Sequence, residues 1–180
     1  MNTIPTCVLK AMLEVIGKNP RVHSRTRFVK CYQYKGDTMV TATNGTTALA
    51  VRLHSTWELP DGGINFAVAM ELAANKGGTA YVHPHHVDPG AGITETVHPI
   101  NAGMARQASA TLRGDNLILL GKVLTKLAPE IGKTPYMDVV TRGEDSTVIT
   151  IGAGGDRIRA IEMVIAAARS RNVPRAERPF

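Results

Sequence analysis

The chain has 180 residues, enough for one well-cored domain or for two small domains with thin cores. Apolar residues make up 43% and charged residues 20% of the sequence, as in ordinary globular proteins. No apolar run approaches the ~20 residues of a transmembrane helix, and the N-terminus lacks a charged segment followed by an apolar one. We therefore expect a cytoplasmic protein with no membrane partner.

The two cysteines argue against a disulfide scaffold. Cys7 and Cys31 are the only ones in the chain, and neither belongs to a Cys-x-x-Cys motif. This usage fits a reducing compartment.

The net charge of +6 is unevenly distributed along the chain. Residues 1–60 contain eight Lys/Arg against three Asp/Glu, residues 61–110 two against four, and residues 111–180 eleven against eight. Two basic flanks around an acidic middle favour a polyanionic partner, nucleic acid before a membrane surface. A soluble basic protein with no polyanionic partner could have the same charge distribution. Charge alone therefore does not decide between the two interpretations.

The first third of the chain predicts a helix followed by three strands. Val8, Met12 and Val15 recur at helical spacing within residues 4–17, and Gly17 stops the pattern. Three strand-like runs then follow, with turn residues between them: 27–34, 38–43 and 48–53. Short runs separated in this way are typical of an antiparallel meander.

The same order returns near the C-terminus. Residues 117–128 predict a second amphipathic helix, which we expect to end at Pro129 and Gly132. Three further strand-like runs follow it: 137–142, 147–151 and 157–166. A helix followed by a three-stranded meander, found twice, is an internal repeat of architecture.

These patterns predict an α+β fold in which the helices lie on one face of the sheets. We expect a single domain over residues 1–169, with a first unit at 4–60 and a second at 111–169. Between them, residues 66–110 read as an insertion or irregular segment, in which we expect a short helix from Phe66 and mostly loop after Tyr81. The tail, 170–180, is expected to be flexible.

Two segments resemble the DNA sliding clamp family of bacterial type. Residues 41–51 are similar to the central-domain segment A-T-D-G-H-R-L-A-V of those clamps, with Asn44 in place of Asp, Thr-Thr in place of His-Arg, and one extra residue before Leu49. Residues 117–169 resemble the closing helix and meander of a clamp. The likeness covers residues 4–54 and 117–166.

The resemblance implies a clamp-like domain and a non-enzymatic function without a cofactor. Clamps are processivity factors that hold duplex DNA without sequence specificity and bind a DNA polymerase or clamp loader. Their rings contain six domains, so a one-domain chain is expected to form a homo-oligomer of about six copies.

The resemblance also implies two sets of site residues. Clamp helices face DNA, and the basic residues around the two predicted helices supply sequence-independent phosphate contacts: Lys10, Lys18, Arg21, Arg25, Lys122, Lys126 and Lys133. Glu14, between Lys10 and Lys18, makes the first helix a weaker phosphate-binding surface. The partner-binding candidates are Thr43, Gly45, Thr46, Thr47 and Leu49, with Val164 and Ile165 opposite them. Solvated helix faces and a plain hairpin turn are the simpler interpretations.

Two other functions remain open at this stage. One is a clamp-fold interaction module that does not encircle DNA, such as a viral protein that binds or blocks a replication factor. The other is a metal-dependent hydrolase using His83, His85, His86 and His98 with Asp88, although their spacing differs from that of binuclear zinc hydrolases. The Gly-rich segment 152–156 precedes a strand and lacks a Lys-Ser/Thr pair, so it does not predict a phosphate-binding loop.

Overall fold

The structure is a computed structural model that describes residues 2–17, 27–54, 58–91, 112–132, 135–142, 146–153 and 155–166. Its helices are α1 (Thr6–Ile16), α2 (Phe66–Ala73) and α3 (Gly114–Ile131), with short 3-10 turns at Pro84–His86 and Pro89–Ala91. Its strands are β1 (Thr3–Pro5), β2 (Phe28–Tyr34), β3 (Asp37–Thr43), β4 (Thr47–Leu53), β5 (Gly62–Asn65), β6 (Thr79–Tyr81), β7 (Val87–Asp88), β8 (Met137–Arg142), β9 (Ser146–Ile151) and β10 (Ile158–Ala166). No helix in this part of the chain is long and apolar enough to cross a membrane.

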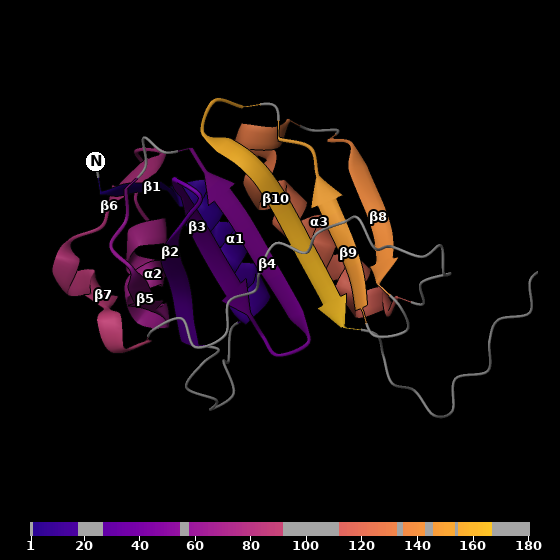
Figure 1. The fold of residues 1–180 in the computed structure, drawn as a ribbon, viewed down its shortest axis with the longest axis horizontal. Helices are drawn as coiled ribbons and strands as arrows, with labels where there is room; N and C mark the ends of the chain where they lie inside the picture. The colour runs from indigo at the N-terminus through magenta and orange to yellow at the C-terminus, as the bar shows by residue number, and fades with distance from the viewer. Residues whose placement is uncertain are drawn as a thin grey trace, which may run out of the picture.

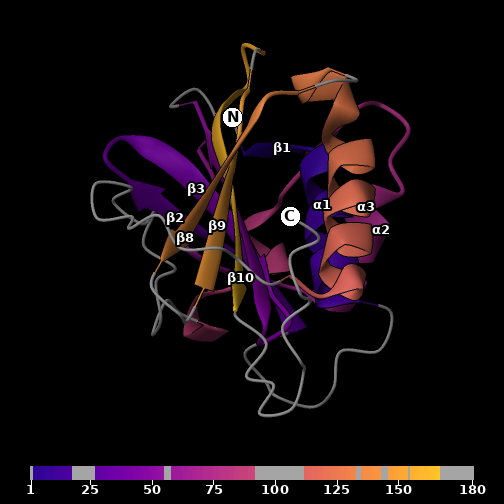
Figure 2. The same cartoon turned by 90° about the vertical axis from the view of Figure 1, so that its right-hand side faces the viewer.

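The elements form two layers, a sheet and a group of helices. Eight antiparallel strands make one sheet in the order β7-β5-β2-β3-β4-β10-β9-β8, and β1 pairs with β6 in a separate two-stranded sheet. Figure 1 views the large sheet from its open face, and Figure 2 shows the three helices gathered on the other face. The predicted α+β fold, with helices on one face, is confirmed.

The large sheet contains two similar halves. In the first half, α1 is followed along the chain by the antiparallel meander β2-β3-β4. In the second half, α3 is followed by the antiparallel meander β8-β9-β10, whose last strand, β10, lies nearest to the first half. The halves join where β4 pairs with β10, with Val51 opposite Ile161 in the middle of the ladder. This junction makes one continuous sheet from segments that lie far apart in the sequence.

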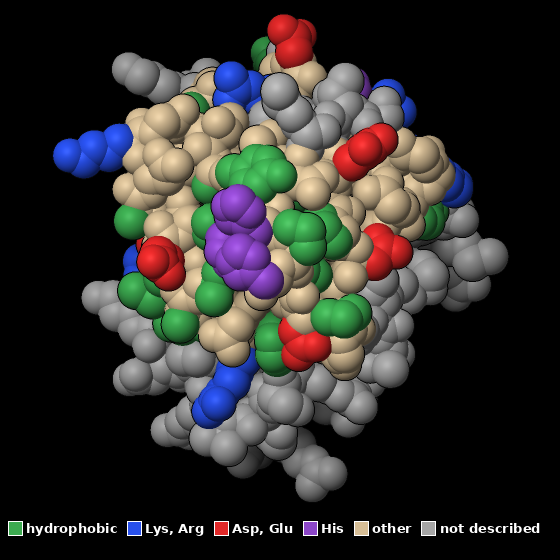
Figure 3. Space-filling view, turned by 90° about the vertical axis from the view of Figure 1, so that its left-hand side faces the viewer, with side chains coloured by type: hydrophobic (Ala, Val, Ile, Leu, Met, Phe, Trp, Pro, Cys, Tyr) green, Lys and Arg blue, Asp and Glu red, His purple; other side chains and the backbone are tan. Residues whose placement is uncertain are grey.

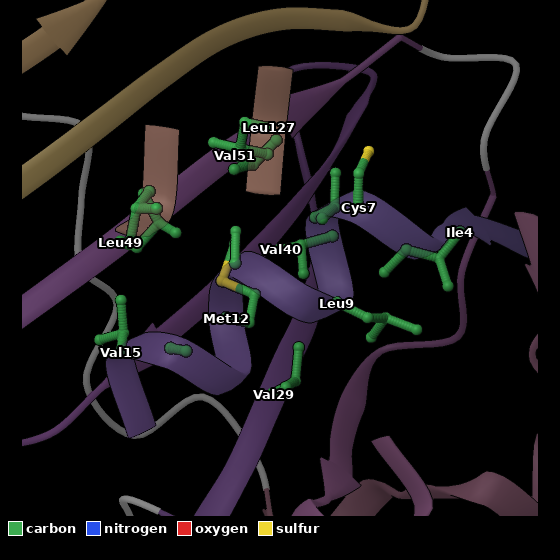
Figure 4. Packing of buried hydrophobic residues seen from close by; sticks show 14 of the residues in the cluster. Ile4, Cys7, Leu9, Met12, Val15, Val29, Val40, Leu49, Val51 and Leu127 are labelled. Carbon is green, nitrogen blue, oxygen red and sulfur yellow. The ribbon is translucent and has the colours of Figure 1, made fainter. Parts of the chain in front are cut away.

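The core lies between the sheet and α1. Leu9, Met12 and Val15 of α1 are buried against side chains of the first meander and of α3, as the close view in Figure 4 shows. Because α2 and α3 flank this helix, little of its surface faces solvent. Thr6 is buried, and Lys10 is the one residue of Thr6–Ile16 in the exposed class.

The second helix is longer at both ends than its sequence predicts. It begins at Gly114 and continues through Pro129 to Ile131. A proline this close to the C-terminus removes one N–H group at the point where the helical ladder is about to end. The helix ends at Gly132, which has a φ of 80° and donates its N–H to the carbonyl of Ala128 at 2.9 Å.

The segment after the first meander is less irregular than expected, in the part that the structure describes. The short helix predicted from Phe66 is confirmed as α2, and Asn65 caps it by accepting a hydrogen bond from the N–H of Ala67. Downstream, β6 pairs with β1, and β7 extends the large sheet beyond β5. Gly62 permits this close pairing, because a Cβ atom there would lie 2.6 Å from Val87 and 2.7 Å from the carbonyl oxygen of Asp88.

Candidate nucleic-acid and partner interfaces

The lysines expected to contact DNA lie in the helix layer. Lys10 of α1 and Lys122 of α3 are both exposed, and neither has an ion-pair partner among the described residues. Lys126, one turn further along α3, is partly exposed. These three ammonium groups therefore share the layer that a clamp would turn toward a duplex.

An ion pair between the two helices reduces the available positive charge. The ammonium group of Lys126 lies 3.6 Å from the carboxylate of Glu14 on α1, with both side chains partly exposed. Such a pair adds ~0–1 kcal/mol to stability, since water screens it. Its larger effect is that the charge of Lys126 is matched within the protein.

The described residues of α1 and α3 carry balanced charge overall. The positive charges are Lys10, Lys122 and Lys126, and the negative charges are Glu14, Asp115 and Glu130. Three minus three leaves a net charge of zero. The other predicted DNA-binding residues are Lys18, Arg21, Arg25 and Lys133. These four lie outside the described residues.

The turn between β3 and β4 is held by a compact set of side-chain hydrogen bonds. The side-chain oxygen of Asn44 accepts from the N–H groups of Thr46 and Thr47, at 3.0 and 2.8 Å. The hydroxyl of Thr43 donates to the carbonyl of Thr47 and accepts from the N–H of Gly45, which has a φ of 94°. This conformation favours glycine at position 45.

The structure brings this turn beside the last strand, as the sequence suggested. Thr47 is opposite Ile165 in the β4–β10 ladder, and the N–H of Ala166 donates to the carbonyl of Thr46 at 2.8 Å. Leu49 and Ile165, however, are buried beneath the helices. A partner at this end therefore meets Gly45, Thr46 and the half-buried Thr43 and Val164 rather than all seven predicted residues.

The histidines form an exposed cluster at the β5–β7 end of the molecule, seen in purple in Figure 3. The ring centroids of His83, His85 and His86 lie 4.4 to 5.2 Å apart, and Tyr81 packs edge-on against His83. The N–H of His83 donates to Nδ1 of His86 at 3.2 Å. Partial burial and the two neighbouring imidazoles lower the pKa of His86. The carboxylate of Glu71 acts in the opposite direction and raises that pKa.

The geometry of this cluster does not give a metal site within the described residues. No group of three or more His, Cys, Asp or Glu side chains there is arranged to hold an ion. Asp88 instead accepts a hydrogen bond from the N–H of Gly90. His98, the fourth predicted member, lies outside the described residues.

Both cysteines are buried thiols. Burial raises the pKa of Cys7 to about 11 and that of Cys31 to about 12. Both thiols are therefore protonated at neutral pH, and a thiolate nucleophile is not available from either.

Apolar side chains are exposed along the end of the molecule formed by β8 and α3. Tyr136 is 92% exposed just before β8, and four further apolar residues there are more than two-fifths exposed: Leu117, Ile118, Met137 and Val139. Met137 and Val139 share a strand face with core residues of β9, but β8 lies beyond the cover of the helices. The alternating pattern predicts the strand, yet it does not reveal that Met137 and Val139 are exposed instead of buried against a helix.

The sequence matches no protein-family model and no curated protein. The assignment of function therefore depends on the fold, on the exposed surfaces and on the resemblance in the two segments described above.

Proposed function

We propose that this protein is a clamp-like accessory factor of DNA replication, without a catalytic activity of its own, that assembles from several copies and contacts duplex DNA without sequence specificity. The observation that carries the proposal is the repeated unit of one helix and one meander, with α1 and α3 on the same face of a shared sheet. The clamp family has the same kind of doubled unit, with its helices toward the DNA.

The free edge of β8 supports assembly. β8 is the last strand of the large sheet, so one side of its backbone has no neighbouring strand among the described residues. An exposed edge with apolar side chains such as Met137 and Val139 is a template for pairing with another chain. Pairing there would extend the sheet from one copy to the next.

The DNA contact depends on few charges. Lys10 and Lys122 are free to reach phosphates, and phosphate contacts by lysines give affinity without base recognition. With a net charge of zero on the described part of α1 and α3, we expect binding that is weak per copy. A ring of copies would raise the affinity through simultaneous contacts.

Mass in solution tests the proposal most directly. Light scattering of the purified protein, alone and with a duplex of ~30 base pairs, should give a particle near six copies, since clamp rings hold six domains. In the same preparation, Lys122→Glu should weaken DNA binding, whereas Asp138→Lys on the sheet should not. A monomer or dimer whose mass DNA does not change would overturn the clamp assignment.

A second candidate function is a protein-interaction module with the same fold that does not hold DNA. The exposed apolar end formed by β8 and α3, together with the balanced charge of the helices, favours it. A DNA polymerase or clamp loader would then be the protein that this module binds or blocks. A monomer that binds no DNA at low salt, but binds such a protein and loses binding on Val139→Asp, would establish this alternative.

A further inference from the structure

A buried carboxylate on the open face of the sheet holds two arginines. Oδ2 of Asp37, whose side chain is 2% exposed, lies 2.6 Å from Nε of Arg52 and 3.1 Å from Nη1 of Arg159. The three residues belong to β3, β4 and β10, and therefore to both halves of the sheet. Asp37 and Arg52 lie on the face away from the helices, because Val40 and Val51, at alternating positions of the same two strands, belong to the core. Arg159 lies at the irregularity of β10 between Ile158 and Ala160, and its guanidinium reaches Asp37 from there.

This cluster has a surplus of positive charge. One carboxylate serves two guanidinium groups, so one positive charge remains unmatched within it. Lys35, whose ammonium lies 5.3 Å from the ring of Tyr34, adds another cation nearby. This part of β10 carries one other carboxylate, that of Glu162. It lies opposite Ala50, which is two residues from Arg52 along β4. By contrast, Arg157 has a carboxylate partner in Glu130, at 3.4 Å.

The arginines retain hydrogen-bond donors. Nε of Arg52 is buried against Oδ2 of Asp37, so the donors that remain for a ligand are on the Nη atoms. Nη2 of Arg159 lies 3.4 Å from Nδ1 of His54, and the two Nη atoms of Arg52 have no partner among the described residues. A guanidinium presents five N–H groups in a planar fork that suits phosphate oxygens.

The position of both guanidinium groups is fixed before any ligand arrives. The buried carboxylate of Asp37 contacts both of them, and the ring of Tyr34 lies 5.8 Å from the guanidinium carbon of Arg52. Their exposed parts face solvent, since the side chain of Arg52 is 25% and that of Arg159 48% exposed. Preorganised donors lose less conformational entropy on binding than free ones.

We propose that Arg52 and Arg159, supported by Asp37, form a binding site for a phosphate-class oxyanion on the open face of the sheet. A tetrahedral anion has enough acceptor oxygens to bridge two guanidinium groups on neighbouring strands, whereas a single carboxylate satisfies one fork. The site is separated from Lys10 and Lys122 by the thickness of the sheet, so it is independent of the proposed DNA contact.

Titration with inorganic phosphate tests the site, followed by the NMR signals of the arginine Nε–H groups at constant ionic strength. In the wild-type protein we expect saturable shifts at Arg52 and Arg159, and an affinity at least ~10-fold weaker in Arg159→Gln. The matched control is Arg157→Gln, since Arg157 is equally exposed, at 47%, but already paired. Its affinity for phosphate should equal that of the wild type.

A third variant and a second anion complete the design. Arg159→Lys keeps the charge but removes the fork, so it should bind phosphate more weakly than the wild type while preserving the contact with Asp37. Equal affinity in the wild type and Arg159→Gln, or an equal loss in Arg157→Gln, would overturn the site. Acetate binding as tightly as phosphate would overturn the ligand class. Duplex DNA that shifts the same two signals would place DNA on the sheet and contradict the helix-layer proposal instead.

Discussion

Glu14 of α1 and Lys126 of α3 join the two repeated units across the helix layer, with carboxylate and ammonium 3.6 Å apart. The pair occupies the surface that the clamp-like proposal assigns to DNA. A lysine that the sequence marks as a phosphate contact is thus already matched inside the protein, and the acidic partner competes with phosphate for it.

Glu14→Gln should therefore strengthen DNA binding. It removes one negative charge and frees Lys126, so the affinity at low salt rises and the slope of log K against log salt steepens by up to ~0.9. Fluorescence anisotropy with a labelled duplex over a salt series measures both quantities. Asp138→Asn makes the same charge change on β8 and is the control. If both variants strengthen binding equally, net charge rather than the helix layer is responsible.

Two leucines of α3 should differ sharply in their contribution to stability. Leu127 is fully buried between α3 and α1, and truncation to Ala there removes core contacts and leaves a cavity, at a cost of about 3 kcal/mol in the free energy of unfolding. Leu117 is 52% exposed, and Leu117→Ala should change that free energy by less than ~1 kcal/mol. Urea denaturation of both variants measures the difference. Comparable losses would mean that the N-terminal turn of α3 is covered in solution, for instance by another copy.

Most strands follow directly from alternation and turn residues, whereas the polar cluster does not. The strand predicted at 38–43 is observed at Asp37–Thr43, a difference of one residue. That residue matters, because Asp37 reads as part of a turn but begins the strand and is buried. Its partners Arg52 and Arg159 come from other strands, and only the three-dimensional pairing of β4 with β10 brings them together.

Helix ends were harder to predict than helix centres. The sequence predicts the start of α3 too late, because Gly114, Asp115 and Asn116 are turn-forming residues and no side chain caps the helix at Arg113. Tertiary packing of Leu120, Val123 and Leu127 stabilises the helix enough to extend it into this unfavourable sequence. Packing of α2 and α3 on the two sides of α1 also covers residues such as Thr6, and periodicity alone cannot reveal this cover.

Two glycines should respond in opposite directions to alanine. Gly62 has a φ of 145°, and a Cβ atom there would lie 2.6 Å from Val87 and 2.7 Å from the backbone of Asp88. Gly62→Ala should therefore lower the free energy of unfolding by at least ~2 kcal/mol and detach β7. Gly121, within α3, has nothing within 4 Å of such an atom. Gly121→Ala should raise stability by ~0.5–1 kcal/mol through helix propensity.

Thermal denaturation with hydrogen exchange at Ile64 and Val87 separates these effects. Exchange should accelerate at both positions in Gly62→Ala, because their strands pair there, and stay unchanged in Gly121→Ala. A fully stable Gly62→Ala would show that β5 and β7 are not paired this closely.

The histidine cluster should make stability fall in mild acid. Partial burial, followed by the charges of His85 and His83, lowers the pKa of His86, while Glu71 acts in the opposite direction. The unfolded chain therefore takes up this proton at a higher pH than the native protein does. The contribution of His86 to stability is complete above its ordinary pKa of 6.5 and is lost as the pH falls below that value. Protonation at Nδ1 also removes the acceptor for the N–H of His83.

NMR titration of the imidazole signals, with urea denaturation at each pH, measures both consequences. His86 should titrate below 6.5, and His85→Ala should move that pKa upward by removing a neighbouring positive charge. Glu71→Gln should move it further down, because the carboxylate is the one group that favours the imidazolium. His86→Gln should flatten the dependence of stability on pH near 6. A wild-type His86 that titrates at or above 6.5 would show that the three rings are not held this close together in solution.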